Sequence, residues 1–497
     1  MIGKSLILAF VVLRVSQAKV NPKLPDVKFN VSTLIFPKGF IFSSASASYQ
    51  VEGGWNEGGK GENIWDRLVH TNPSVVANND NGDVACDTYH KYKEDIQNMK
   101  TIGFQMHRFS LSWSRLFPDG FVTKPNPDGV RFYNDFIDEL LKNGIKPMVS
   151  IYHWDLPQPL QDMGGWLNPL IVDIFGDYAR EVYKLFGKKV KWWIPINEPM
   201  SISTGYGSVH GAPMLNLHGI GEYLSVHNVL LAHAKAYRIY DKEFRSSQKG
   251  KVGLNLSDQF VLPKNASNPE DVAAAERGNQ FVFGWIGHPV YGKGGDYPAV
   301  MREYVDRKSK EEGYKQSRLP YFSKEEIETL KGSSDYLALN HYSCVLATTG
   351  ATGETPSISR DQNIIKSIDE SWTKSHCDWL LIVPEGFKKT LRWLRREYDN
   401  PEIFITENGF CGSDNEDDDK LRIEYIKKYL SELIAAIKEG SKVIGYNHWS
   451  LMDNFEWLDG YTSKFGLMRV DFKDPNRTRT FRNSASLFNQ IIKQNSK

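Results

Sequence analysis

Hydrophobic residues along the chain alternate between short apolar runs and longer stretches in which apolar positions recur at helical spacing. The short runs are rich in β-branched and aromatic residues, which is typical of buried strands. We predict strands at residues 40–49, 104–110, 147–152, 190–196, 251–256, 336–340, 403–406 and 443–446. We predict helices between them at residues 89–102, 130–143, 170–186, 223–244, 387–398 and 421–439. Strands alternating with helices predict the α/β class, as a single closed (β/α)8 TIM barrel with elaborated βα loops.

The first residues of the chain have a different pattern from the rest. Lys4 precedes an apolar run at residues 6–13, and Ser16-Gln17-Ala18 has the small-x-small form of a cleavage site. This pattern predicts a secretory signal at residues 1–18, since the run is too short to span a membrane. We therefore expect one barrel domain over residues 19–497, secreted and without a membrane partner.

Composition narrows the classes of ligand. The 497 residues have a formal net charge of +1, which gives no electrostatic footprint for nucleic acid. We find no glycine-rich phosphate motif after a strand. Aromatic residues make up 12% of the chain, with 13 Trp and 23 Tyr. Because aromatic rings offer flat apolar faces, this abundance suits ligands such as sugars.

Cysteine and asparagine patterns fit the secretory route. One disulfide among Cys344, Cys377 and Cys411 is expected, whereas Cys86 should pack as a small buried residue. Sequons that predict glycan acceptors, if they are exposed, occur at Asn30, Asn255, Asn265 and Asn476.

Polar and aromatic residues follow the predicted strands at the ends where a barrel of this kind carries its chemistry. These residues come from strands far apart in the sequence: Gln50, Arg108, His153, Asn197, Glu198, Asn340, Tyr342, Glu407, Trp449, Glu456 and Trp457. Taken one at a time, these residues could have purely structural roles: His153 could be a satisfied core histidine, and Trp449 and Trp457 could pack within the barrel. The whole set at one rim favours a binding site.

Two carboxylates in this set suggest a reaction. Glu407 closes an apolar run, and alone it would more often be a buried ion-pair partner. Glu198, from another strand, supplies a second carboxylate. A retaining glycosidase uses one carboxylate as nucleophile and the other as acid/base, about 5–5.5 Å apart. Arg108 could place positive charge beside Glu407. We predict no metal site, because no tetrahedral set assembles around Cys86 and His90, and the acidic residues 414–419 read as a solvated loop.

Several motifs resemble glycoside hydrolase family 1, the β-glucosidase family. They extend along nearly the whole predicted mature chain, and they are Asn197-Glu198-Pro199, Ile405-Thr406-Glu407-Asn408-Gly409, Tyr49-Gln50-Val51-Glu52-Gly53, and the runs at residues 108–115, 152–157 and 449–457. The resemblance implies a glycosidase domain at residues 19–497, Glu198 as acid/base and Glu407 as nucleophile. It implies sugar contacts from Gln50, His153, Asn197, Trp449, Glu456 and Trp457. It also implies that Tyr342 bonds the nucleophile, that Trp379 stacks on the aglycone, that Arg108 and Asn340 support the site, and that the enzyme needs no cofactor.

The resemblance leaves alternatives open. The secretory features resemble the secreted animal branch, insects in particular, which favours hydrolysis of β-glucosides. Plant myrosinases of this family replace the acid/base Glu with Gln, so Glu198 argues against that type, although an animal thioglucosidase of the myrosinase type could act with both carboxylates present. A transglycosylase would use the same residues, and a homodimer stays open. A non-catalytic binding module is disfavoured, since both carboxylates are present. One departure is Pro195-Ile196, where the family usually has Thr and an aromatic residue; a proline removes a hydrogen-bond donor from a central strand.

Overall fold

The computed structural model describes residues 22–496. The predicted signal at residues 1–18 therefore lies outside the described residues. Eight parallel strands close into a barrel in the order β1-β13-β12-β7-β5-β4-β3-β2. The strands are β1 (Ile41–Ala45), β2 (Met106–Ser110), β3 (Lys146–Tyr152), β4 (Trp192–Ile196), β5 (Lys251–Ser257), β7 (Tyr336–Asn340), β12 (Ile403–Glu407) and β13 (Val443–His448). The predicted (β/α)8 barrel is confirmed.

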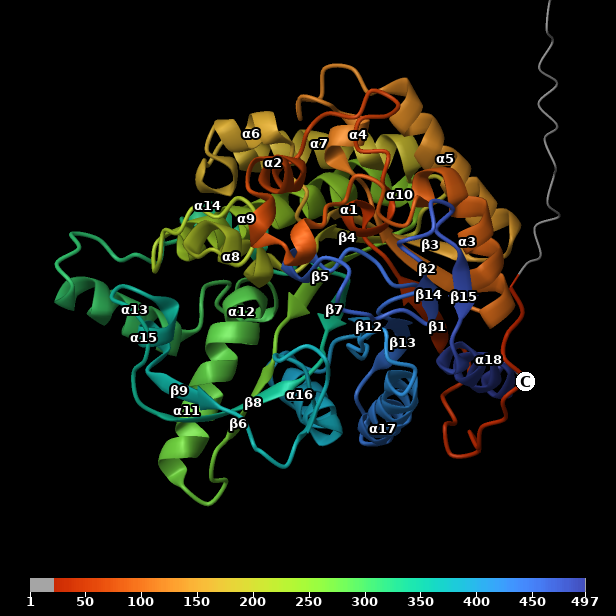
Figure 1. Ribbon diagram of the computed structural model, residues 1–497. Coiled ribbons are helices and arrows are strands. Elements are labelled where there is room, and N and C mark those ends of the chain that lie inside the picture. The colour runs from red at the N-terminus through yellow and green to blue at the C-terminus, as the bar shows by residue number, and fades with distance from the viewer. Residues whose placement is uncertain (1–21, 497) are drawn as a thin grey trace, which may run out of the picture.

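Helices surround the barrel in the ribbon view (Figure 1). The longer ones are α3 (Thr88–Ile102), α5 (Pro127–Lys142), α7 (Ile171–Phe186), α9 (Gly221–Ile239), α16 (Pro384–Glu397), α17 (Asp418–Lys438) and α18 (Asn483–Asn495). A π-helical turn, Tyr240–Phe244, continues α9, so the helix predicted at residues 223–244 is confirmed in extent. Asn126 caps α5 through its side chain, with Pro127 at the first helical position, a sequence that favours helix initiation.

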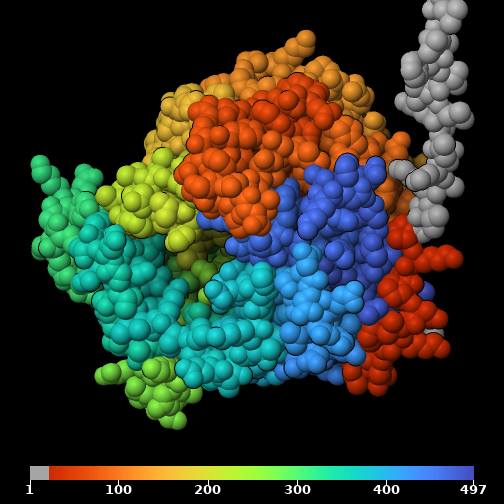
Figure 2. Space-filling view, viewed as in Figure 1, coloured from red at the N-terminus to blue at the C-terminus, as the bar shows by residue number. Residues whose placement is uncertain are grey.

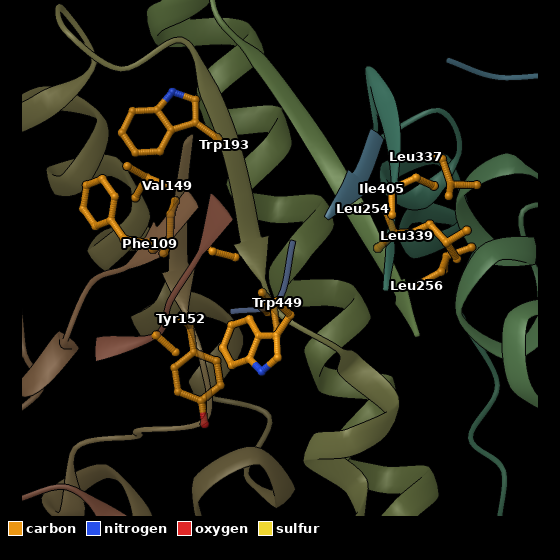
Figure 3. Close-up of a cluster of buried hydrophobic side chains, with 14 of the residues drawn as sticks. Phe109, Val149, Tyr152, Trp193, Leu254, Leu256, Leu337, Leu339, Ile405 and Trp449 are labelled. Atoms are coloured by element: carbon orange, nitrogen blue, oxygen red, sulfur yellow. The ribbon is translucent and has the colours of Figure 1, made fainter. Parts of the chain in front are cut away.

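Alternation along the strands divides the core into two layers. Residues of one parity fill the barrel interior: Met106, Met148, Ile194, Tyr336, Ala338 and Phe404. Residues of the other parity pack under the helices, and Figure 3 shows several of them, including Leu254, Leu256, Leu337, Leu339 and Ile405. One step further along the interior face the side chains become polar, beginning with Arg108, Ser150, Asn340 and Thr406. The barrel floor is therefore apolar and its mouth polar.

The first predicted strand was too long. β1 ends at Ala45, and residues Ser48–Val51 form a short helix, α1. The chain leaves the barrel at Ser46, whose N–H donates to the carbonyl of Arg108 at 2.9 Å. Gln50 consequently lies on α1, and no strand holds it.

Pro195 has the expected effect on β4. Pairing of β4 with β5 consists of Trp192 with Lys251 and Trp193 with Val252, and it stops before Pro195. Beyond that point the N–H of Glu198 donates to the Asn255 side chain of β5 at 2.7 Å. A side chain thus replaces the strand ladder where the proline lacks a donor.

The elaboration of the βα loops is greatest after β5 and β7. A small sheet, β6 (Phe260–Pro263), β8 (Cys344–Thr349) and β9 (Ile364–Ser367), lies with α11 (Pro269–Asn279) away from the barrel (Figure 1). Further helices follow α11: α12 (Trp285–Tyr291), α13 (Ala299–Glu311) and α14 (Lys324–Leu330). The strand-and-helix alternation did not reveal these elements, because they are short and interrupt the βα repeat.

The disulfide and the lengths of the helices test two further sequence predictions. Cys377 and Cys411 form a disulfide, so one bridge among the three later cysteines is confirmed, and Cys86 and Cys344 are free and buried. No helix among residues 22–496 is long and apolar enough to cross a bilayer.

Candidate active site

Glu198 and Glu407 open onto one cavity at the carboxyl end of the barrel strands. Glu407 is the last residue of β12. Glu198 follows β4 and precedes helix α8 (Pro199–Gly207), with a φ of 42° that turns the chain sharply. The cavity has a volume of about 470 Å³ and both glutamates line it. Figure 2 shows the corresponding hollow between segments far apart in sequence. Burial of both carboxylates is nearly complete.

Two donors hold the Glu407 carboxylate. The Arg108 guanidinium forms an ion pair with Oε1, and the Tyr342 hydroxyl donates to Oε2 at 2.7 Å. Arg108 itself is fixed by Ser150, which accepts from its Nε at 3.0 Å, and by the side-chain oxygen of Asn197. The positive charge predicted beside Glu407 is therefore present, in a fully buried setting where it is weakly screened.

The Glu198 carboxyl has a different environment. Asn340 Nδ2 donates to its Oε1 and Ser201 Oγ donates to its Oε2, both at 2.7 Å. Asn340 lies beside Glu407 in the β7–β12 register, so it links the surroundings of the two glutamates. No cation forms an ion pair with Glu198 among the described residues.

This difference in partners changes the proton affinity of Glu198. Burial raises its pKa to about 7, and the negative charge of Glu407 adds to that rise. Hydrogen bonds from Asn340 and Ser201 and the charge of Arg108 oppose the shift without cancelling it. The two carboxyls thus sit side by side in one site with unequal charge compensation, the arrangement that separates an acid from a nucleophile.

Of the predicted sugar-binding residues, His153, Trp449, Glu456 and Trp457 line the same cavity, and Asn197 and Gln50 lie behind them in contact with His153 and Glu456. The Nε2 of His153 lies 3.0 Å from Asn197 Nδ2. Burial and the charge of Arg108 lower the pKa of His153, so the ring is neutral. Its Nδ1 is buried and has no hydrogen-bond partner among residues 22–496. The structural reading of His153 as a satisfied core histidine is wrong, because one ring nitrogen is unsatisfied beside a cavity.

Gln50 contacts the segment that follows β13. Its Nε2 donates to Asn454 Oδ1 and to the carbonyl of Phe455, both at 2.9 Å, and more weakly to Glu456. Its Oε1 is buried and unpartnered within the described chain. Gln50 and His153 therefore each present one unused polar atom, as a site for hydroxyl groups requires.

Aromatic side chains complete the walls. The His153 ring stacks on both Trp449 and Trp457 with centroids 6.0 Å apart. Glu456 lies beside them, and burial together with the charges of Asp459 and Glu407 raises its pKa well above the usual value. Trp379 lies at the mouth, 45% exposed, with its ring edge-on to Tyr342 at 5.5 Å.

The sequence did not single out four residues that contact this set. Ser201 bonds Glu198, Asn454 bonds Gln50, and the Thr406 hydroxyl donates to Asn340 Oδ1 at 2.7 Å. Asn255 donates to Asn340 Oδ1 and Thr406 Oγ1, both at 3.1 Å. Thr406 lies in the motif at residues 405–409 and Asn454 in the motif at residues 449–457, so the sequence carries a signal for both. Ser201 and Asn255 carry no such signal.

Asn255 also corrects a prediction. It was expected to be a glycan acceptor, but its side chain is fully buried inside the barrel mouth and hydrogen-bonded on both ends. A glycan cannot be attached there in the folded protein. Asn30, Asn265 and Asn476 are exposed and stay candidate acceptors.

Comparison with known proteins places this site in a family. The sequence model of glycosyl hydrolase family 1 matches residues 32–497. Myrosinase 1 of Brevicoryne brassicae is 51% identical over 459 residues, 92% of this chain and 98% of that protein. The solved structure of an aphid myrosinase superposes with a TM-score of 0.90 at 50% identity, covering 92% of this chain and 99% of that one. A rice β-glucosidase superposes with a TM-score of 0.86 at 37% identity, covering 93% and 99%. With this fold and this cavity, the chain belongs to glycosyl hydrolase family 1, and it is a β-glycosidase.

Proposed function

We propose that this β-glycosidase is a retaining β-glucosidase in which Glu407 is the nucleophile and Glu198 the acid/base. The observation that carries the proposal is the unequal pair: Glu407 receives a guanidinium and a phenol, whereas Glu198 has no ion-pair partner among the described residues and a pKa raised to about 7. A nucleophile must be charged and an acid must hold a proton at working pH. The environment of Glu407 therefore supports the role of nucleophile, and that of Glu198 supports the role of acid.

The first step of this mechanism forms a glycosyl-enzyme. An oxygen of Glu407 attacks the anomeric carbon while the bond from that carbon to the aglycone oxygen breaks. The proton of Glu198 passes to the departing oxygen, which leaves Glu198 as a carboxylate. In the second step a water attacks the same carbon, Glu198 takes the proton of that water, and Glu407 is released.

Sugar recognition follows from the unsatisfied groups of the site. His153 Nδ1 and Gln50 Oε1 are buried without a partner among the described residues, and hydroxyl groups of a sugar would satisfy them. Trp449 and Trp457 provide apolar faces for the C–H groups of the ring, and Glu456 provides a further polar edge. Asn197 contacts His153 behind the lining. At the mouth, the exposed Trp379 offers a stacking surface for the aglycone.

The test compares two glutamine variants with a matched control. Glu407→Gln should lower turnover of an aryl β-glucoside by at least about a thousandfold while the fold is retained, because the nucleophile is lost. Glu402→Gln, a half-exposed glutamate just before the same strand, is the control and should keep wild-type turnover. Near-normal activity of Glu407→Gln would refute the nucleophile assignment.

Glu198→Gln tests the acid. It should slow glucosides with poor leaving groups by about a hundredfold or more, and those with good leaving groups much less, since a good leaving group needs little protonation. Equal losses would contradict an acid role. NMR of the first-formed sugar should show the β anomer, and an α product would exclude double displacement.

A thioglucosidase activity is the second candidate, favoured by the 51% identity to Myrosinase 1 of Brevicoryne brassicae. Transglycosylation onto an added alcohol is the third, and product analysis with that acceptor measures it. A panel of aryl glucoside, galactoside, fucoside, cellobiose and a glucosinolate, assayed side by side, ranks these activities. We expect the aryl glucoside to be the best substrate.

We further propose that the protein is secreted as a glycoprotein. The support is the leader-like sequence at residues 1–18 and the exposed sequons at Asn30, Asn265 and Asn476. Expression in insect cells with and without residues 1–18 should place enzyme in the medium only with them. Peptide mapping should find glycan at the exposed sequons and none at Asn255.

A further inference from the structure

The aglycone end of the cavity carries an unusual balance of charge. Beyond the two glutamates and Glu456, the acidic and histidine residues of its lining are Asp258, Asp459, His153 and His210, and within the described chain it includes no lysine or arginine. Asp258 follows β5 and Asp459 ends the short turn Trp457–Asp459, so the two carboxyls come from separate elements. A charge on the wall of a cavity is screened less than one on an open surface, so it acts more strongly on a ligand placed there.

The deep carboxyls contribute little to this balance. Arg108 compensates Glu407, and raised pKa values favour the neutral forms of Glu198 and Glu456. Asp258 and Asp459 are different, because neither forms an ion pair with a lysine or arginine in the described part of the chain. Burial also raises the pKa of Asp258, without the large rise seen for Glu456, and the charge of Lys366 opposes this rise although Lys366 does not line the cavity. The negative charge offered to an aglycone therefore comes from these two residues.

A second, independent feature lies beside Asp258. Ser257 Oγ lines the cavity, the residue is 5% exposed, and the hydroxyl has no hydrogen-bond partner among residues 22–496. A buried unsatisfied hydroxyl indicates a bonding position that a ligand can fill. Trp379 at the same mouth offers an aromatic face, a surface that attracts cations as well as apolar groups.

We propose that Asp258 and Asp459 determine aglycone specificity by charge, so that the enzyme favours glucosides with cationic or neutral aglycones and discriminates against anionic ones. This inference rests on the proposed glucosidase function and adds the class of aglycone to it. An anionic aglycone such as that of a glucosinolate would meet two carboxylates and, among the described residues, no lysine or arginine on the cavity wall. A cationic aglycone would meet both carboxylates and the Trp379 ring.

The experiment uses three aryl β-glucosides that differ only in a para substituent behind a methylene: trimethylammonium, hydroxyl and sulfonate. The methylene keeps the leaving groups similar in acidity, so charge is the variable. For the wild-type enzyme we expect kcat/KM for the cation to exceed that for the anion by about tenfold or more, the effect of about 1.4 kcal/mol. Asp258→Asn and Asp459→Asn should each lower this ratio several-fold, and the double variant should bring it near one.

Two kinds of control make the result specific. Asp258→Glu and Asp459→Glu keep the charge and should keep the ratio, whereas Asp177→Asn, an exposed aspartate on α7, should leave it at the wild-type value. Equal kcat/KM for cation and anion, or a preference for the anion, would overturn the proposal. Titration of the three glucosides into Glu407→Gln gives the same ratio from Kd values without turnover. A failure of catalysis and a failure of charge selection are therefore separate results.

Discussion

At the scale of single residues, the site depends on how two identical side chains are surrounded. Glu407 accepts from Arg108 and Tyr342, whereas Glu198 accepts, within residues 22–496, from the neutral donors Asn340 and Ser201. Both carboxylates are buried, so the partner of each decides how costly its charge is. Burial raises the pKa of Glu198, the glutamate without the guanidinium, to about 7, which supports its proposed role as the acid.

This difference predicts the pH dependence of the enzyme. The pKa of Glu198 is raised to about 7, so the acid is protonated below that pH and loses its proton above it. For a glucoside with a poor leaving group, kcat/KM should therefore fall about tenfold per pH unit well above pH 7. Glu198→Gln should lack this basic limb, and a profile unchanged by that variant would assign the limb to another group.

Ser201 should affect the pH at which the basic limb of the pH profile begins to fall. Its hydroxyl donates to Glu198 Oε2 at 2.7 Å, which favours the charged carboxylate. Ser201→Ala removes the donor, so the pKa of Glu198 should rise further and the basic limb should move to higher pH. Ser203→Ala is the matched control, because Ser203 bonds the carbonyl of Met200 and does not contact Glu198. A role in folding alone would lower activity at all pH values without moving the limb.

At the scale of elements, loops and strand ends place the side chains. Pro195 stops the β4–β5 ladder, and the gap is occupied by Asn255, which also bonds Asn340 and Thr406. The α1 helix, which replaces the end of the predicted first strand, carries Gln50 to Asn454 and Glu456. The Cys377–Cys411 disulfide ties the segment that contains Trp379 to the loop after β12.

Removal of this disulfide should affect both stability and aglycone binding. For a sequence separation of 34, loop closure in the unfolded chain predicts a loss of about 3–4 kcal/mol in the Cys377→Ser/Cys411→Ser variant. Because Trp379 lies two residues from Cys377, KM for bulky aglycones should rise more than KM for a methyl glucoside. Thermal melting and the paired KM values measure the two effects. Cys344→Ala, at a free buried cysteine, should leave the KM ratio unchanged.

At the scale of the whole molecule, the two ends of the chain close the barrel. β1 and β13 pair in parallel, and residues near the start of the described chain bond α18 near its end (Figure 1). The N–H of Phe29 donates to Gln490 at 2.8 Å and that of Phe36 to Asn495 at 2.7 Å. Closure makes the site depend on contacts between segments several hundred residues apart.

A further contact between distant segments, a buried salt bridge, should contribute strongly to stability. Asp95 on α3 and Arg479 on β15 (Arg479–Phe481) form a salt bridge with both side chains at most 1% exposed. Asp95→Ala would leave a buried uncompensated guanidinium and should cost about 3–5 kcal/mol of unfolding free energy. Arg131→Ala, which breaks an exposed pair with Asp128, should cost less than about 1 kcal/mol. Similar losses in the two variants, measured by denaturant unfolding, would contradict this account.

The sequence by itself determined the barrel, the two glutamates and most of their neighbours. Apolar periodicity fixes strand and helix order, and a parallel barrel brings all strand ends to one rim, so the site follows from topology. Only the tertiary structure decided the burial of Asn255, the contact of Ser201 with Glu198 and the small sheet of β6, β8 and β9. Those depend on contacts between distant segments, which no local pattern encodes. The proton on Glu198 likewise depends on burial and on the charge of Glu407, quantities that exist only once the chain has closed.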